Sequence, residues 1–409
     1  MIRIVFFYLA AFGTSLLGNS ITAIALPLLV LFTTGSPMGA GAVAIAAAVP
    51  SAVAGLLMGS LMDRINRRTV AILSDVISAV ALVILPVIEL TVGLHLGWFI
   101  AVAVLNSFGD VPGITAREAM LPAVAQAAGM DPSRLIGLRE SLAGVSLLVG
   151  PAIAGILVAS LEPVAVMWVT SGIAASAALL TLVIPSRSTR LPRAEQEDRA
   201  PQDDSEPEAP RSVFSGLVVI FRTPLLRVVV LLGLALAVVL AALQGMVIPV
   251  HFAFQGEAGF VGFVLSALAG GLLVGGGLFA WFGARIPRRG WFTAGVTVVA
   301  VGFVVVGVLG PVWSVFAGAA IVGLGGGCMN AVVGLTFVEN VVDAQRGKVL
   351  GGQNAIMTLV PSVGIGMAAV LIEIGTLHVA TTTLVLVWIG AAAATLLSPS
   401  IRRLGHASP

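Results

Sequence analysis

The fold of this chain is decided by one short charged stretch, Gly59-Ser60-Leu61-Met62-Asp63-Arg64-Ile65-Asn66-Arg67-Arg68-Thr69. One aspartate and three arginines fill it, and long apolar runs leave from both of its ends. Such a loop is typical of the cytoplasmic side of a membrane protein, where basic residues concentrate between spanning helices. A weaker copy, Arg285-Ile286-Pro287-Arg288-Arg289, returns in the second half, with Ala284 opposite Asp63. The repeat predicts two related halves in one chain.

Composition places the chain among helical membrane proteins. Of its 409 residues, 58% are hydrophobic and 10% are charged, whereas a soluble protein carries about 25% charged residues. The apolar runs are continuous rather than alternating, which favours spanning helices, and each helix needs about 20 apolar residues. We predict twelve spanning helices, at residues 4–32, 38–62, 70–90, 96–119, 133–160, 164–185, 223–252, 258–283, 290–309, 312–338, 345–373 and 377–399.

The basic residues predict the orientation of these helices. With the N-terminus inside, all 21 Lys and Arg residues fall in segments predicted to be cytoplasmic. These segments are the N-terminal tip, 63–69, 117–139, 185–227, 284–289, 343–348 and the tail from residue 400. We therefore expect a multi-pass protein with both termini in the cytoplasm. The bias toward alanine, valine, glycine and arginine favours a bacterial source, hence a bacterial cytoplasmic membrane. The basic charge is a topology signal and indicates no nucleic-acid partner.

A polar stretch rich in Pro, Glu, Asp and Arg separates two hydrophobic halves. We predict an N-terminal six-helix bundle at residues 1–185, a disordered cytoplasmic linker at 186–212, a C-terminal six-helix bundle at 213–400 and a cytoplasmic tail at 401–409. The single cysteine, Cys328, excludes an intramolecular disulfide and a cysteine metal cluster. The sequence shows no catalytic grouping and no nucleotide-binding loop, so we expect no enzymatic activity, no metal and no cofactor.

The stretch from Gly59 to Arg68 resembles the signature loop of the major facilitator superfamily, which lies between helices 2 and 3. Further stretches resemble its drug/proton antiporter branch, which includes macrolide-efflux and enterobactin-export proteins. They are Thr34-Gly35-Ser36-Pro37, Ser74-Asp75, and Pro112 followed by Ala116-Arg117-Glu118-Ala119-Met120-Leu121-Pro122. Ser78 stands where this branch implies a basic residue. The resemblance covers essentially the whole chain and implies an all-α fold of two pseudo-symmetric six-helix halves that work by alternating access.

The same resemblance implies roles for two groups of residues. Gly59, Asp63, Arg64, Arg67 and Arg68 would form a gate that latches the cytoplasmic ends of the two halves in the outward-open state. By themselves, Asp63 can also cap the next helix or pair with an arginine, and the arginines can face the anionic leaflet. The Gly-Pro antiporter motif is similar to Gly150-Pro151-Ala152-Ile153-Ala154-Gly155, which gives span 5 a bendable face, so Gly150, Pro151 and Gly155 are hinge candidates.

Span 4 carries the most informative polar residues. Asn106, Asp110, Gly113 and Arg117 recur at i, i+4, i+7 and i+11, which places them on one helical face. A carboxylate in hydrocarbon costs about 2.5–3.5 kcal/mol on insertion scales, so Asp110 should face an interior cavity and have a partner. Two interpretations stay open. Asp110 couples protons to transport, or it forms a static ion pair with Arg117 or Arg139.

Glu140 is a second candidate for proton coupling, although a structural ion pair at the cytoplasmic boundary suits the dipeptide Arg139-Glu140 better. The resemblance implies that spans 1, 4, 7 and 10 line a central cavity. The polar residues that they offer are Asn19, Thr22, Asn106, Asp110, Gln244 and Asn330. The remaining wall is aliphatic, which suits a mainly apolar solute rather than a sugar or an inorganic anion.

We therefore expect a monomeric exporter that exchanges a lipophilic small molecule for protons, with membrane lipids as its surroundings. Three alternatives stay open. The chain could translocate a lysophospholipid or another lipid, it could be an uncoupled facilitator, or it could be a membrane sensor that binds a ligand without transporting it.

Overall fold

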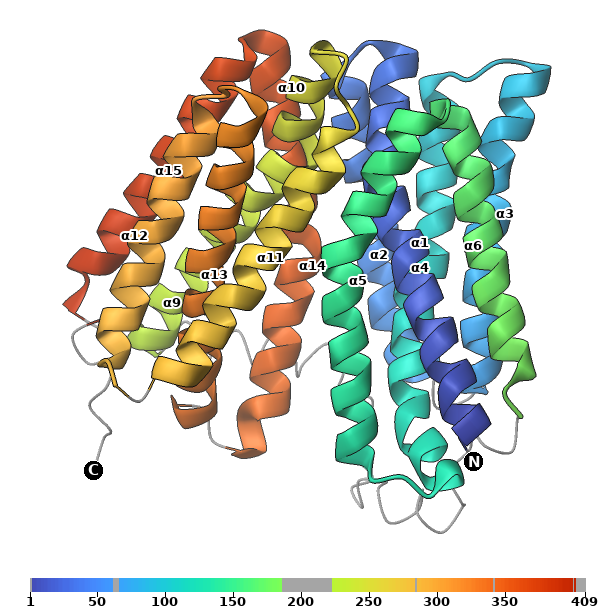
Figure 1. The fold of residues 1–409 in the computed structure, drawn as a ribbon, viewed down its shortest axis with the longest axis horizontal. Helices are drawn as coiled ribbons and strands as arrows, with labels where there is room; N and C mark the ends of the chain where they lie inside the picture. Colours follow the sequence, from blue (N-terminus) through green and yellow to red (C-terminus); the bar gives the residue numbers. More distant parts are fainter. Residues whose placement is uncertain are drawn as a thin grey trace. The chain divides into compact units, whose positions relative to one another are not determined.

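The computed structural model describes residues 2–61, 66–185, 223–283, 285–340, 343–399 and 401. The chain divides into two compact units, residues 1–205 and 206–409 (Figure 1). The predicted linker at 186–212 and the tail at 402–409 lie outside the described residues.

The first unit is a bundle of six helices. They are α1 (Ile2–Thr34), α2 (Pro37–Leu61), α3 (Arg67–Thr91), α4 (Leu96–Ala128), α5 (Pro132–Ser160) and α6 (Pro163–Val183). The N-terminus and the turn between α4 and α5 lie at the same end of this unit (Figure 1). Asp131 caps α5 by accepting a hydrogen bond from the Ser133 backbone N–H at 2.7 Å. The bonds from Ser133 hold the pKa of this exposed carboxyl below its usual value.

The second unit again provides six spans. They are α9 (Pro224–Ala242) continued by η2 (Leu243–Val247) and α10 (Ile248–Phe254), then α11 (Phe260–Phe282), α12 (Arg288–Gly307), α13 (Val312–Asn340), α14 (Asp343–Ile374) and α15 (Leu377–Leu397). Among the described residues, 11 helices are long and apolar enough to cross a membrane, and α14 adds the shorter apolar stretch Leu359–Ile374. The prediction of an all-α membrane protein with twelve spans is confirmed.

The fourth span is longer than predicted. We expected it to end at residue 119, but α4 continues to Ala128 and stops at Gly129, whose φ of 61° is left-handed. A glycine in this conformation is a common helix stop because it has no Cβ. Arg117 therefore lies inside a helix and is buried, and not in a loop that begins at residue 117 as we expected.

The seventh span is not one regular helix. Between α9 and α10, residues Leu243–Val247 form a π-helical turn, which contains the candidate cavity residue Gln244. Pro249 follows closely, and a proline cannot donate the hydrogen bond that the preceding turn of an α-helix requires. A π turn is one way in which a helix accommodates such a defect, and π turns are frequent at functional sites.

Glycines set the packing of the second unit. A Cβ built on Gly271, Gly275, Gly323 or Gly327 would lie 2.0–2.2 Å from a backbone oxygen of the facing helix. These four residues therefore let α11 and α13 approach until their backbones touch, which is how helices associate without a hydrophobic driving force. The glycine-rich run at 323–327 lies within the continuous helix α13 in this contact.

We expect Gly275→Ala to destabilise the protein, because the new methyl group would lie 2.1 Å from the Leu324 carbonyl oxygen. Overpacking of this kind costs about 1–3 kcal/mol. The neighbouring Gly276→Ala is the matched control, since its Cβ would meet nothing within 4 Å. Thermal unfolding of the purified protein in detergent measures both variants. An equal unfolding midpoint for the two would contradict the packing role of Gly275.

Candidate functional site

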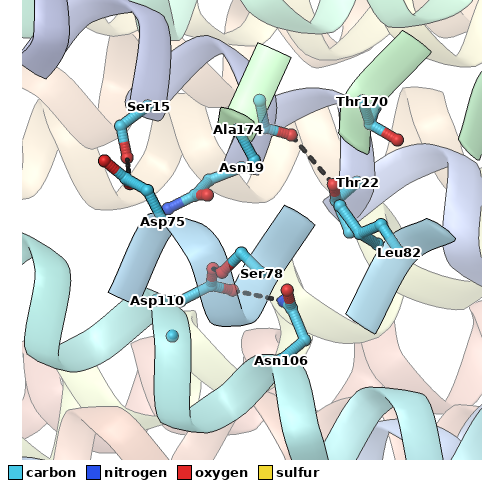
Figure 2. A pocket seen from close by; sticks show the side chains of 12 residues that line it. Ser15, Asn19, Thr22, Asp75, Ser78, Leu82, Asn106, Asp110, Thr170 and Ala174 are labelled. Atoms are coloured by element: carbon cyan, nitrogen blue, oxygen red, sulfur yellow. Dashed lines mark hydrogen bonds between the residues drawn. The ribbon is translucent and has the colours of Figure 1, made fainter. Parts of the chain in front are cut away.

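A small polar pocket lies inside the first unit, between α1, α3, α4 and α6 (Figure 2). Its volume is about 10 Å³, which is close to the space that one water molecule occupies. Its wall is formed by Ser15, Gly18, Asn19, Thr22, Asp75, Ser78, Leu82, Asn106, Gly109, Asp110, Thr170 and Ala174. The structure thus brings together four of the residues predicted from the sequence, namely Asn19, Thr22, Asn106 and Asp110.

Asp110 is held by neutral hydrogen-bond donors. Asn106 Nδ2 donates to Asp110 Oδ2 at 2.7 Å, and Ser78 Oγ donates to Asp110 Oδ1 at 3.2 Å. The Asn19 amide is assigned with its nitrogen toward this carboxylate, because its oxygen would otherwise face only acceptors, and in this orientation the nitrogen donates to Asp110 Oδ1 at 3.3 Å. The predicted common face of Asn106 and Asp110 on α4 is confirmed by their i, i+4 hydrogen bond.

A glycine makes the contact with Ser78 possible. A Cβ on Gly109 would lie 2.2 Å from Ser78 Oγ and 2.8 Å from the Ser74 carbonyl oxygen. Only glycine therefore lets α3 and α4 approach closely enough for Ser78 to reach Asp110. The position at which the family resemblance implied a basic residue instead supplies a neutral donor.

Arg117 pairs with Asp75 and not with Asp110. Its Nη2 contacts Asp75 Oδ2, and the two side chains are 2% and 6% exposed. Ser15 completes this group, since Ser15 Oγ donates to Asp75 Oδ1 at 3.2 Å and accepts from Arg117 Nη1 at 3.1 Å. Among the described residues, no arginine forms an ion pair with Asp110. This geometry contradicts the interpretation in which Asp110 forms a static pair with Arg117 or Arg139, although both arginines do form ion pairs, with Asp75 and Glu118.

Tyr8 and Ser15 are among the residues of this site that were missed in the sequence. Tyr8, the single tyrosine of the chain, donates from its hydroxyl to the Arg117 carbonyl oxygen at 3.0 Å. Ser15, which lies on α1 like Tyr8, contacts both members of the Asp75–Arg117 ion pair. The spacing of Ser15, Asn19 and Thr22, at i, i+4 and i+7, was the available signal, because it places three polar side chains on one face of span 1.

Arg139 lies in a separate, more exposed group. It donates to Glu118 Oε1 at 2.6 Å, lies 3.6 Å from Glu140 Oε1 and stacks over the Phe12 ring with its guanidinium carbon 5.1 Å from the ring centre. The Glu140 side chain is 61% exposed. This geometry favours the structural role of Glu140 over proton coupling.

The signature loop is described only in part, because Asp63 and Arg64 lie outside the described residues, and Gly59 lies near the end of α2. Asn66, rather than Asp63, caps α3, and its side chain accepts from the Arg68 backbone N–H at 3.1 Å. The two remaining arginines contact carbonyl groups of neighbouring helices.

Arg67 Nη1 donates to the Ala119 carbonyl oxygen at 2.7 Å, and Arg68 Nη2 donates to the Leu182 carbonyl oxygen at 2.6 Å. Arg68 thereby caps the last turn of α6, where a cation also complements the helix dipole. These arginines tie the start of α3 to α4 and to the end of α6 within the unit.

The other candidates lie apart from the pocket. A Cβ on Gly150 would lie 2.7 Å from Ser20 Cβ, so Gly150 lets α5 approach α1 closely. Pro151 and Gly155 are buried in the same continuous helix. In the second unit, Gln244 is half-buried and Asn330 is exposed.

We expect Arg117→Gln and Asp75→Asn to be more destabilising singly than together. Each single change leaves one buried charge without its partner, which costs about 3–5 kcal/mol, whereas removing both charges is much less costly. Thermal unfolding midpoints of the two single variants and of the double variant test this. Wild-type stability of Arg117→Gln alone would contradict the ion pair.

Comparisons with known proteins agree with this fold. The family model of the Major Facilitator Superfamily matches residues 8–255, more than half of the chain. The chain is 29% identical over 394 residues to the multidrug efflux pump Tap of Mycolicibacterium fortuitum, covering 96% of this chain and 94% of that protein. It is 24% identical over 374 residues to macrolide efflux protein A of Streptococcus pyogenes, covering 90% and 89%.

Solved structures of other transporters have the same fold. The nucleoside transporter NupG superposes with a TM-score of 0.76 at 14% identity, covering 97% of this chain and 98% of that one. A bacterial homologue of the human lysosomal transporter Spinster superposes with a TM-score of 0.70 at 14% identity, covering 98% and 97%. With the twelve spans and the matching family model, the chain belongs to the Major Facilitator Superfamily.

Proposed function

We propose that this chain exports lipophilic small molecules from a bacterial cytoplasm in exchange for protons. The observation that carries this proposal is its similarity, over 96% of its length, to a multidrug efflux pump. The similarity to macrolide efflux protein A supports the same direction of transport and makes macrolides candidate substrates.

Asp110 is the residue that we propose to carry the coupled proton. It lies within a spanning helix, where a carboxylate is energetically costly and is therefore usually found at a functional site. Its donors are Ser78, Asn106 and Asn19, all of them neutral. A carboxylate held by a guanidinium is ionised except transiently, whereas one held by neutral groups exists in either protonation state without leaving a buried cation behind.

Protonation of Asp110 would change contacts among three helices. As a carboxylate it accepts hydrogen bonds from Ser78 of α3, Asn106 of α4 and Asn19 of α1. As a carboxylic acid it has one donor of its own and weaker acceptors. The proton therefore alters how strongly these helices are held together, which is the differential interaction that alternating access requires.

The substrate chemistry is supported by an apolar groove of the first unit. It lies between α1 and α5, has a volume of about 660 Å³ and is open on one side. Its wall is aliphatic and aromatic except for three hydroxyl groups, from Thr14, Ser141 and Ser146. A groove of this size suits a drug-sized molecule bound by burial and a few hydrogen bonds.

We also propose that the protein works as a monomer with both termini in the cytoplasm. The orientation is supported by the distribution of the basic residues, which lie in the predicted cytoplasmic segments except for Arg117, buried within α4. The monomer is supported by the presence of two six-span units in one chain, because alternating access needs two such units and no further copy.

Asp63 and the arginines of the signature loop form the proposed cytoplasmic latch. We expect Asp63→Asn to lower the rate of transport while leaving the amount of protein in the membrane unchanged, since the change removes one charge from a loop. Transport by cells at equal expression measures this. Normal transport by this variant would refute the latch.

Asp110→Asn should abolish proton-coupled transport, with a loss of about 100-fold, the order expected for removal of a proton-transferring group. Purified protein in liposomes that contain a pH-sensitive dye and an acidic lumen reports proton efflux when radiolabelled erythromycin or ethidium is added outside. Glu140→Gln is the matched control and should keep close to the wild-type rate, because its side chain is 61% exposed.

Two outcomes would count against this function. Substrate movement by the wild type without proton flux would indicate an uncoupled facilitator or a lipid translocator. If Glu140→Gln lost proton coupling and Asp110→Asn kept it, the coupling role would belong to Glu140.

A further inference from the structure

We propose that Asp75 is a second proton-carrying carboxylate, linked to Asp110 through the pocket between them, with Arg117 as its counter-charge. This inference rests on the proposed function, because it assigns the next step of a proton that reaches Asp110. It gives the Asp75–Arg117 pair a part in coupling besides its part in stability.

Both carboxylates line the same pocket, from different helices. Asp110 belongs to α4 and Asp75 to α3, and the pocket between them also contains Ser15 and Asn19 of α1 (Figure 2). A polar connection through Asn19 and Ser15 joins the two aspartates. The Asn19 amide reaches both Asp110 Oδ1 and the Ser15 carbonyl oxygen at 3.3 Å, and Ser15 Oγ donates to Asp75 Oδ1 at 3.2 Å.

Asn106 supplies an independent sign that the pocket holds a ligand. The residue is 8% exposed, and its Oδ1 is buried and has no hydrogen-bond partner among the described groups of the protein. Figure 2 shows this oxygen turned into the pocket. A buried acceptor without a donor is costly, and a pocket of about 10 Å³ with several polar groups suits one water molecule. The occupant that we infer is therefore a water that donates to Asn106 Oδ1.

Such a water carries a proton between the aspartates in one balanced step. The O–H bond of protonated Asp110 breaks and its proton passes to the water oxygen. One of the water's own O–H bonds breaks, and that proton binds an oxygen of Asp75. The water is regenerated, Asp110 becomes a carboxylate, Asp75 becomes neutral, and Arg117 keeps its proton.

The positions of the two groups give the step a direction. The Arg117 guanidinium reaches back along α4 to Gly113, since a Cβ on Gly113 would lie 3.3 Å from Arg117 Nη1. Asp75, which pairs with this guanidinium, therefore lies about one helical turn, or about 5 Å, beyond Asp110 toward the end of α4 at Ala128. It also lies only eight residues, or about 12 Å, from the start of α3 at Arg67. Both of these helix ends are predicted to be cytoplasmic, so the path runs from Asp110 toward the cytoplasm.

The surroundings of the pair make Asp75 a transient carrier. Arg117 and Ser15 contact its carboxylate, Tyr8 binds the Arg117 backbone, and Asp110 is the other charged group across the pocket. Protonation of Asp75 leaves the Arg117 guanidinium buried without its anion, which is strongly unfavourable. Asp75 therefore holds a proton briefly and releases it, whereas Asp110, with neutral donors, is suited to hold it longer.

The test compares two transport activities, and the ratio between them separates a loss of proton transfer from a loss of stability. Proteoliposomes that contain the wild type or Asp75→Asn/Arg117→Gln are assayed for uptake of radiolabelled erythromycin or ethidium driven by an acidic lumen. The same liposomes are assayed for counterflow, the exchange of labelled for unlabelled substrate at equal pH, which needs no net proton movement. A purely structural defect lowers both activities together and leaves their ratio unchanged.

We expect this double variant to lower the ratio of driven uptake to counterflow by about 100-fold, the order expected when a proton-transferring group is lost. Asp75→Glu, which keeps a titratable carboxylate beside Arg117, should restore most of the ratio. Glu118→Gln/Arg139→Gln is the matched control. It removes an ion pair of the same unit that lies outside the pocket, and it should keep the wild-type ratio.

Ala174→Val tests the pocket water separately. Ala174 lines the pocket without a polar group, and the added methyl groups occupy the space of the water, so the ratio should fall although both aspartates remain. A wild-type ratio in Asp75→Asn/Arg117→Gln or in Ala174→Val would overturn the relay while leaving proton coupling at Asp110 intact. A wild type that moves substrate without protons would overturn the proposed function, and the relay with it.

Discussion

The first unit depends on one electrostatic constraint, which is that a charge inside a membrane protein needs a partner. Asp75 and Arg117 satisfy this for each other, and both are almost fully removed from solvent. Their attraction fixes the relative position of α3 and α4, and Ser15 and Tyr8 extend the same group to α1. Because removal of either charge strands the other in a low-dielectric interior, this contact specifies how the three helices fit together and therefore where the polar pocket forms.

The pocket places two carboxylates in chemically different surroundings. Asp75 has a guanidinium partner, and Asp110 has three neutral donors. Two residues near Asp110 cause this difference. Ser78 has a hydroxyl where a basic side chain would have neutralised Asp110, and Gly109 removes the Cβ that would have held Ser78 away. An ionic contact can thus hold the structure while a neighbouring carboxylate stays available to a proton.

Much of this could be predicted from the sequence, but only where one helix contains the information. The spans follow from apolar runs of bilayer length, and the bond between Asn106 and Asp110 follows from their i, i+4 spacing. The partner of Arg117 could not be predicted, because helical periodicity shows which residues share a face and not which helix packs against it. The end of α4 was misplaced for a similar reason, since a charged residue at 117 was taken as a loop signal although Asp75 of another helix neutralises it. The roles of Asp63 and of the linker stay predictions.

Different interactions hold the helices together in the two units, and this difference affects where a proton can act. In the second unit, α11 and α13 are held by direct backbone contact at Gly271, Gly275, Gly323 and Gly327. Among the residues of that unit whose side-chain burial is described, no carboxylate is buried. Close packing of this kind responds little to a proton, because no charge changes at the contact. A proton does change the contacts of Asp110, which join α1, α3 and α4. A ligand shifts a conformational equilibrium only through interactions that differ between the states. Under the proposed function, proton binding would therefore act through the polar pocket of the first unit. The glycine-packed helices of the second unit would then move as rigid elements.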